Sequence, residues 1–67
     1  MSRFLEVEIG YEPVRKYCFD IEELVSFCED YENPAERTVI SLRNGDGYSI
    51  KMTYEDLFAE LDDKDYE

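Results

Sequence analysis

Two segments of the chain share one amphipathic pattern, and this pattern constrains the fold more than any other feature of the sequence. Asp20 opens the first segment, which runs to Asp30, and Thr53 opens the second, which runs to Asp63. In each, apolar residues follow the opening residue at positions i, i+3, i+4 and i+7, the spacing that lines one side of an α-helix. We therefore expect two helices, each begun by a capping residue.

Acidic residues occupy the polar side of each expected helix and form two doublets in each segment. The eight residues are Glu22, Glu23, Glu29, Asp30, Glu55, Asp56, Asp62 and Asp63. At ~1.5 Å per residue, the two doublets of one helix lie about 10.5 Å apart along its axis. That separation approaches the ~12 Å width of the DNA major groove, across which rows of phosphates face each other. These eight carboxylates are the predicted partner-binding site.

The second doublet of each segment indicates that the charge has a use beyond solubility. It falls at an expected helix C-terminus, where exposed negative charge costs roughly 0.3–1 kcal/mol. A merely solvated face usually mixes signs, because Glu–Lys pairs at i,i+4 stabilise a helix. Residues 20–36 contain no Lys or Arg, and neither do residues 52–63. This one-signed surface favours a cationic partner.

The remaining apolar segments predict strands. They are Glu6–Ile9, Tyr17–Phe19, Val39–Leu42 and Tyr48–Met52. Asn44-Gly45, between the last two segments, is a strong hairpin signal because both residues accept positive φ. The expected fold is an α+β, ββα-ββα pseudo-repeat with halves 4–31 and 37–63. Its four-stranded, mainly antiparallel sheet carries both helices on one face.

A competing interpretation of the first half stays open. Residues 24–29 can instead form a strand that pairs with residues 38–43, which leaves only one helix. In either case residues 1–67 are expected to form a single domain, because the chain is too short for two. Residues 64–67 are expected to be a frayed tail.

The charge balance excludes several functions. Eighteen Asp and Glu residues against seven Lys and Arg give a net charge of −11, and histidine is absent. Such a charge repels nucleic acid and anionic membranes and attracts basic surfaces. Without histidine or a cysteine in a basic setting, the chain lacks an activated nucleophile. The acids do not follow the EF-hand ligand pattern. We therefore expect no catalytic residue, no metal site, no cofactor, no direct nucleic-acid binding and no membrane partner.

Other residues support less specific expectations. Cys18 and Cys28 lie in apolar contexts and are interpreted as buried structural thiols, although the sequence leaves a disulfide open. Tyr17 and Tyr54 are expected in the core, whereas the other tyrosines are compatible with an interface. Arg37 is interpreted as a residue that balances negative charge within the molecule, and not as part of a binding patch. Because no signal-peptide or transmembrane run is present, the expected location is the cytoplasm, including that of a host cell.

The short length, strong acidity and helical rows of Asp and Glu resemble the small DNA-mimic inhibitors of phages and mobile elements, including anti-CRISPR proteins. The resemblance implies a non-enzymatic inhibitor that imitates nucleic-acid phosphates and blocks a basic nucleic-acid-binding groove on a host or defence protein. Separately, Thr38–Leu61 is similar to a small flagellar and swarming-motility family. The alternative function is a structural or regulatory protein–protein interaction module, dimeric through an apolar sheet face.

Overall fold

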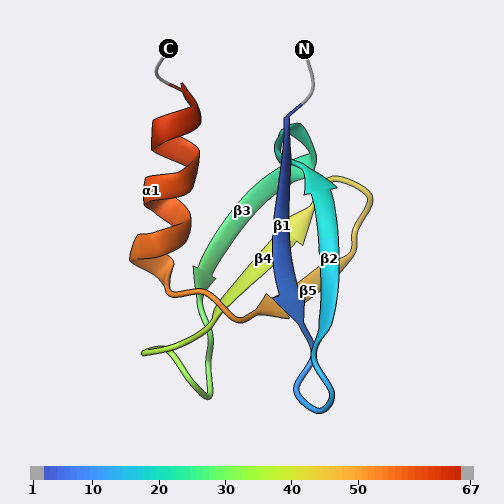
Figure 1. Cartoon of the computed structure of the whole chain (residues 1–67), viewed down its shortest axis with the longest axis vertical. Helices are drawn as coiled ribbons and strands as arrows, with labels where there is room; N and C mark the ends of the chain where they lie inside the picture. Colours follow the sequence, from blue (N-terminus) through green and yellow to red (C-terminus); the bar gives the residue numbers. More distant parts are fainter. Residues whose placement is uncertain (1–2, 66–67) are drawn as a thin grey trace.

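The computed structural model describes residues 3–65, apart from the side chains of 63–65, and within them the chain forms five strands and one α-helix (Figure 1). The elements are β1 (Phe4–Ile9), β2 (Arg15–Asp20), the short 3-10 helix η1 (Ile21–Glu23), β3 (Leu24–Glu29), β4 (Thr38–Leu42), β5 (Gly47–Ile50) and α1 (Tyr54–Asp65). The strands form one antiparallel sheet in the order β2-β1-β5-β4-β3. The two edge strands are therefore β2 and β3.

The first predicted helix is absent, so the expected ββα-ββα fold with a four-stranded sheet and two helices is wrong. Asp20 does act as a cap, because its Oδ1 accepts a hydrogen bond from the Glu22 N–H at 3.0 Å. Only the three residues of η1 follow this cap before β3 begins at Leu24. β3 then pairs with β4, which is the arrangement of the competing interpretation.

A β-bulge in β3 explains why the sequence imitates a helix. Leu24 lies opposite Leu42 on β4. Phe27, three residues after Leu24, lies opposite Ile40, which is only two residues before Leu42. The extra residue on β3 breaks the alternation of the strand, so both Leu24 and Phe27 pack against the core. Apolar residues three apart are typical of a helix, but here they share one face of a bulged strand.

The strand predictions for the other four segments are confirmed, with slightly different ends. The predicted hairpin joins β4 to β5, where the Leu42 N–H donates to the Asp46 carbonyl at 2.8 Å. The Gly45 N–H donates to the Leu42 carbonyl at 3.0 Å. Gly45 has a φ of +98°, which residues with a side chain rarely adopt. The Asn44-Gly45 signal thus identified the position of the turn, although Gly45 has a positive φ and Asn44 does not.

The helix predicted from Thr53 is confirmed as α1. The Thr53 Oγ1 accepts a hydrogen bond from the Asp56 N–H at 3.1 Å, which satisfies one unpaired amide of the first turn. The helix continues to Asp65, beyond the expected end at Asp63, and residues 66–67 lie outside the described part of the chain. Leu57, with no exposed surface, anchors α1 on the core.

The hydrophobic core lies between one face of the sheet and α1. Its buried members are Leu5, Val7, Ile9, Phe19, Ile40, Leu42, Ile50 and Leu57. On each strand these residues alternate with residues that face the other way, as the two-residue period of a strand requires. α1 lies beside β3 and runs in the opposite direction to it (Figure 1). The half-buried Tyr17 and Tyr54 pack against their aromatic neighbours Tyr48 and Phe27, with ring centres 4.7 Å and 5.1 Å apart.

Both cysteines are exposed free thiols, so the prediction that they are buried is wrong. Cys18 lies on β2 opposite Glu6, and Cys28 lies on β3 opposite Val39. These strands form the two edges of the sheet, with β1, β5 and β4 between them. At ~4.8 Å per strand, the two positions are about 19 Å apart along the sheet. A disulfide needs Cα atoms within about 7 Å, so the two thiols do not pair.

Candidate functional site

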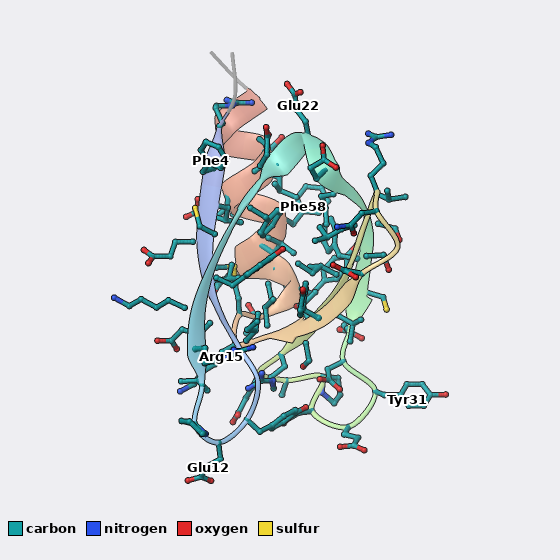
Figure 2. All side chains as sticks on the ribbon, turned by 90° about the vertical axis from the view of Figure 1, so that its right-hand side faces the viewer. Phe4, Glu12, Arg15, Glu22, Tyr31 and Phe58 are labelled. Atoms are coloured by element: carbon teal, nitrogen blue, oxygen red, sulfur yellow. The ribbon has the colours of Figure 1, made fainter. Side chains whose placement is uncertain are left out.

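The acids of the first segment do not form a helical array. Glu22 and Glu23 are exposed in η1, and Glu29 is exposed at the far end of β3. At ~3.3 Å per residue, an extended chain places Glu23 and Glu29 roughly 20 Å apart. This is about twice the separation expected on a helix. Figure 2 shows Glu22 at one end of the molecule, where η1 leads into β3.

Asp30 is buried, with 5% of its surface exposed, although the sequence placed it on a binding surface. Its Oδ2 accepts hydrogen bonds from the Ser49 hydroxyl at 2.6 Å and from the Tyr11 hydroxyl at 3.2 Å. Its Oδ1 accepts a hydrogen bond from the Glu32 N–H at 2.8 Å. The Ser49 bond contributes most to lowering the pKa of Asp30, because donors stabilise the charged carboxylate. Asp30 therefore holds the fold together and does not belong to an exposed binding surface.

Arg37 completes this buried polar cluster and is also 5% exposed. Its Nη2 donates to the carbonyls of Gly10 at 2.7 Å and Ser49 at 2.9 Å, and its Nε donates to the Ser49 hydroxyl at 3.0 Å. Since Ser49 in turn donates to Asp30, one hydroxyl connects the buried cation to the buried anion. Arg37 thus lies inside the fold, in keeping with the internal role that the sequence suggested.

The acids of the second segment keep the expected helical arrangement. Glu55 and Asp56 are exposed in the first turn of α1, where the positive end of the helix dipole favours them. Asp62 is exposed near the other end, and the side chain of Asp63 lies outside the described part of the chain. Glu55 and Asp62 are separated by two helical turns, or about 10.5 Å along the axis. The structure therefore retains one acidic helix instead of two.

An apolar groove runs along the junction of α1 and β3. We call it the α1–β3 groove and define it by Leu24, Val25 and Phe27 of β3 and Phe58 and Leu61 of α1. One open hollow of about 270 Å³ lies between Phe27, Phe58 and Leu61 and is bordered by Asp62. Val25 is 60% exposed and Phe58 is 52% exposed, although both are large apolar residues.

The sequence does not predict this groove, because its spacing places Val25 and Phe58 on the buried stripes of two helices. Only one helix forms, and the rest of the fold covers the apolar side chains of α1 only in part. Leu57 consequently enters the core, whereas its neighbour Phe58 remains half exposed. The adjacent Leu57-Phe58 pair is the sequence signal, since two large apolar residues in succession broaden the stripe of a helix.

Carboxylates border the groove on its helical side. Glu55 and Asp62 line a second shallow hollow together with Phe58 and Ala59. Glu29 lies where β3 ends and α1 begins, because the two elements run in opposite directions (Figure 1). Arg3 lines the groove near Ile21, at the opposite end from Glu29. Acidic residues therefore lie at both ends of the groove, because Glu22 and Glu23 follow Ile21 in η1 and are exposed.

Among the residues that the structure describes, no three His, Cys, Asp or Glu side chains converge in a way that would hold a metal ion. Within residues 3–65, α1 is too short and too polar to cross a membrane. Comparison of the chain with protein-family models, with curated proteins and with solved structures finds no match.

Proposed function

We propose that this protein is a non-enzymatic acidic inhibitor that binds the basic nucleic-acid-binding groove of another protein in the cytoplasm. The observation that carries the proposal is the row of exposed carboxylates on α1, formed by Glu55, Asp56 and Asp62. Glu55 and Asp62 lie about 10.5 Å apart along the helix, which resembles the distance between facing phosphate rows. Each carboxylate would replace one phosphate contact to a Lys or Arg of the partner.

The distribution of charge supports this proposal. Asp30 and Arg37 are both buried, so one charge of each sign is removed from the surface. The net charge of −11 is therefore carried by the remaining, mainly exposed, ionised groups. A surface of this kind attracts basic proteins over a distance and repels nucleic acid. Binding by exposed charges is expected to weaken steeply as the salt concentration rises.

The test begins with the full chain immobilised and exposed to an extract of a candidate host. Partners that elute in a salt gradient are identified, purified and mixed with labelled DNA or RNA in an electrophoretic mobility-shift assay. We expect the chain to displace the nucleic acid from the partner. Captured partners that bind no nucleic acid, or that hold nucleic acid and the chain together, would contradict the proposal.

Charge-reversal variants make the test specific to α1. The double variant Glu55→Lys, Asp62→Lys should compete about tenfold less well, whereas the matched control Glu12→Lys, Glu36→Lys should lose less than about threefold. The control makes the same change in net charge at exposed positions outside α1. Asp30 is not reversed, because its buried hydrogen bonds hold the fold. If both variants lost the same fraction of their competition with nucleic acid, the total charge of the protein would explain binding, and α1 would not be a defined binding surface.

The exposed apolar side chains Val25 and Phe58 favour a second candidate, a protein–protein interaction module that forms a homodimer. Sedimentation velocity distinguishes the two functions. A dimer that persists from low to high salt, together with the lack of a basic partner, would support the module. We expect a monomer at low salt, because two copies that each carry −11 repel one another.

A further inference from the structure

We infer that the α1–β3 groove binds a basic amphipathic helix of the partner. The inference rests on the proposed function and adds to it the form of the partner element. The apolar side of that helix would lie on Val25, Phe58 and Leu61, and its Lys or Arg residues would contact Glu55 and Asp62. Binding of an amphipathic helix in an apolar groove is a recurrent mode of recognition.

The apolar surface of the groove is continuous. Phe27 and Leu61 line both of the hollows that lie between α1 and β3, so these hollows form one surface. Phe58 borders this surface from the helix and Val25 borders it from the strand, each with more than half of its area exposed. Exposed apolar residues that share one groove are typical of an interaction site, whereas single exposed residues are not. Figure 2 shows Phe58 midway along the molecule, away from the loops at either end.

Two carboxylates lie beside the apolar surface of the groove. Glu55 and Asp62 line the hollow on the helical side together with Phe58. They lie two turns apart, about 10.5 Å along α1, and basic residues at i and i+7 of a partner helix have the same separation. A helix lying along α1 would therefore meet both carboxylates at once.

Charge complementarity also selects among occupants of the groove. A second copy of this chain would bring Glu55 and Asp62 against further acidic surface, which like-charge repulsion disfavours. A neutral apolar helix would leave both carboxylates without a partner at the edge of the contact. A basic helix satisfies the apolar surface and the carboxylates together.

The experiment uses a fluorescent synthetic peptide of about 18 residues, long enough to form a helix when bound, built from Leu and Lys at amphipathic spacing. A scrambled peptide of identical composition serves as the control for charge alone. Fluorescence anisotropy at low salt measures the binding of each peptide to the full chain. We expect the amphipathic peptide to bind about tenfold more tightly than the scrambled one, because only it presents a continuous apolar face.

Two substitutions test whether the peptide binds in the groove. Phe58→Ser should weaken its binding about tenfold, whereas Tyr31→Ser should change it less than about twofold. Tyr31 is 92% exposed and lies at the end of the molecule opposite Glu22 (Figure 2), so it is a matched aromatic control. Val25→Ser repeats the test from the strand side, and circular dichroism verifies that each variant is folded.

The outcomes separate this inference from the proposed function. Equal binding of the two peptides, or equal effects of Phe58→Ser and Tyr31→Ser, would overturn the groove as the binding site while leaving the charge-based function standing. If neither peptide bound at low salt, the proposed attraction to basic partners would fail as well. Loss of binding in the Glu55→Lys, Asp62→Lys variant alone, without any effect of Phe58→Ser, would also contradict the groove.

Discussion

The guanidinium carbon of Arg37 lies 4.1 Å from the centre of the Tyr11 ring, so this buried cation lies over the face of an aromatic ring in the loop between β1 and β2. The same guanidinium donates to the carbonyls of Gly10 and Ser49. This one side chain therefore joins the β1–β2 loop, β5 and the start of β4. The connection explains how a small domain orders two loops at one end of its sheet.

Replacement of Arg37 by Lys should destabilise the fold although the charge is retained. Lysine lacks the planar fork that reaches two carbonyls and a hydroxyl while stacking on Tyr11. We expect the free energy of unfolding to fall by about 3 kcal/mol, as for the loss of charge-assisted hydrogen bonds in a buried site. Urea denaturation measures this change, with Arg15→Lys at an exposed position as the control. Similar midpoints for the two variants would contradict the role of Arg37.

The hydrogen bonds to Asp30 predict how the stability depends on pH. The Ser49 bond and the other donors hold the pKa of Asp30 below its ordinary value of 3.8. Its ionised form therefore stabilises the native state at pH values above about 4, and this contribution is lost as the pH falls through the folded pKa. Thermal unfolding of Asp30→Asn and the unaltered chain should show a large difference at neutral pH that shrinks in acid. A difference independent of pH would show that the charge of Asp30 does not matter.

The cap of α1 can be tested by changing one hydroxyl. Thr53→Ala removes the acceptor for the Asp56 N–H and should lower the free energy of unfolding by about 1 kcal/mol. Thr53→Ser keeps the acceptor and should remain close to the unaltered chain. Chemical denaturation followed by far-ultraviolet circular dichroism compares the two variants. If Ser and Ala had the same effect, the hydrogen bond would not be the cause.

Leu57 and Phe58 are adjacent on α1 but should differ in their effect on stability. Leu57→Ala removes a side chain with no exposed surface and should cost about 2–5 kcal/mol. That is a large share of the ~3–10 kcal/mol expected for a domain of this size, so extensive unfolding is expected. Phe58→Ala should cost clearly less, because 52% of its surface is already exposed. Equal costs in urea denaturation would indicate that Phe58 belongs to the core and not to a binding surface.

Much of the fold could be predicted from local sequence signals. The Asn44-Gly45 turn, the Thr53 cap and the alternation of Val7 and Ile9 with Glu6 and Glu8 each identify an element without knowledge of the rest. These signals succeed because they act within a few residues of one another.

The segment that begins at Asp20 could not be assigned from its spacing alone. Its cap is real, but it starts a single turn, and the bulge then sets Leu24 and Phe27 three residues apart on a strand. What decides the outcome is β4, whose edge on the side away from β5 would stay unpaired if β3 did not pair with it. The pairing with β4 depends on a distant part of the chain, so the spacing of apolar residues after Asp20 cannot reveal it.

The candidate site was predictable to the same limited extent. Glu55 and Asp62 keep their positions because α1 follows its local pattern. Asp30 does not, because its partners Ser49 and Tyr11 lie 19 residues away in either direction. An acidic residue is usually at the surface, and only the tertiary arrangement of these donors places this one inside.

The positions of Cys18 and Cys28 have a consequence for the handling of this protein. The thiols lie on opposite margins of one sheet, too far apart to react with each other, and each is accessible to solvent. Air oxidation would consequently form disulfides between separate molecules. Because each molecule carries two such thiols, the products would form a ladder of disulfide-linked polymers on a non-reducing gel. No monomer with an internal disulfide between Cys18 and Cys28 would form.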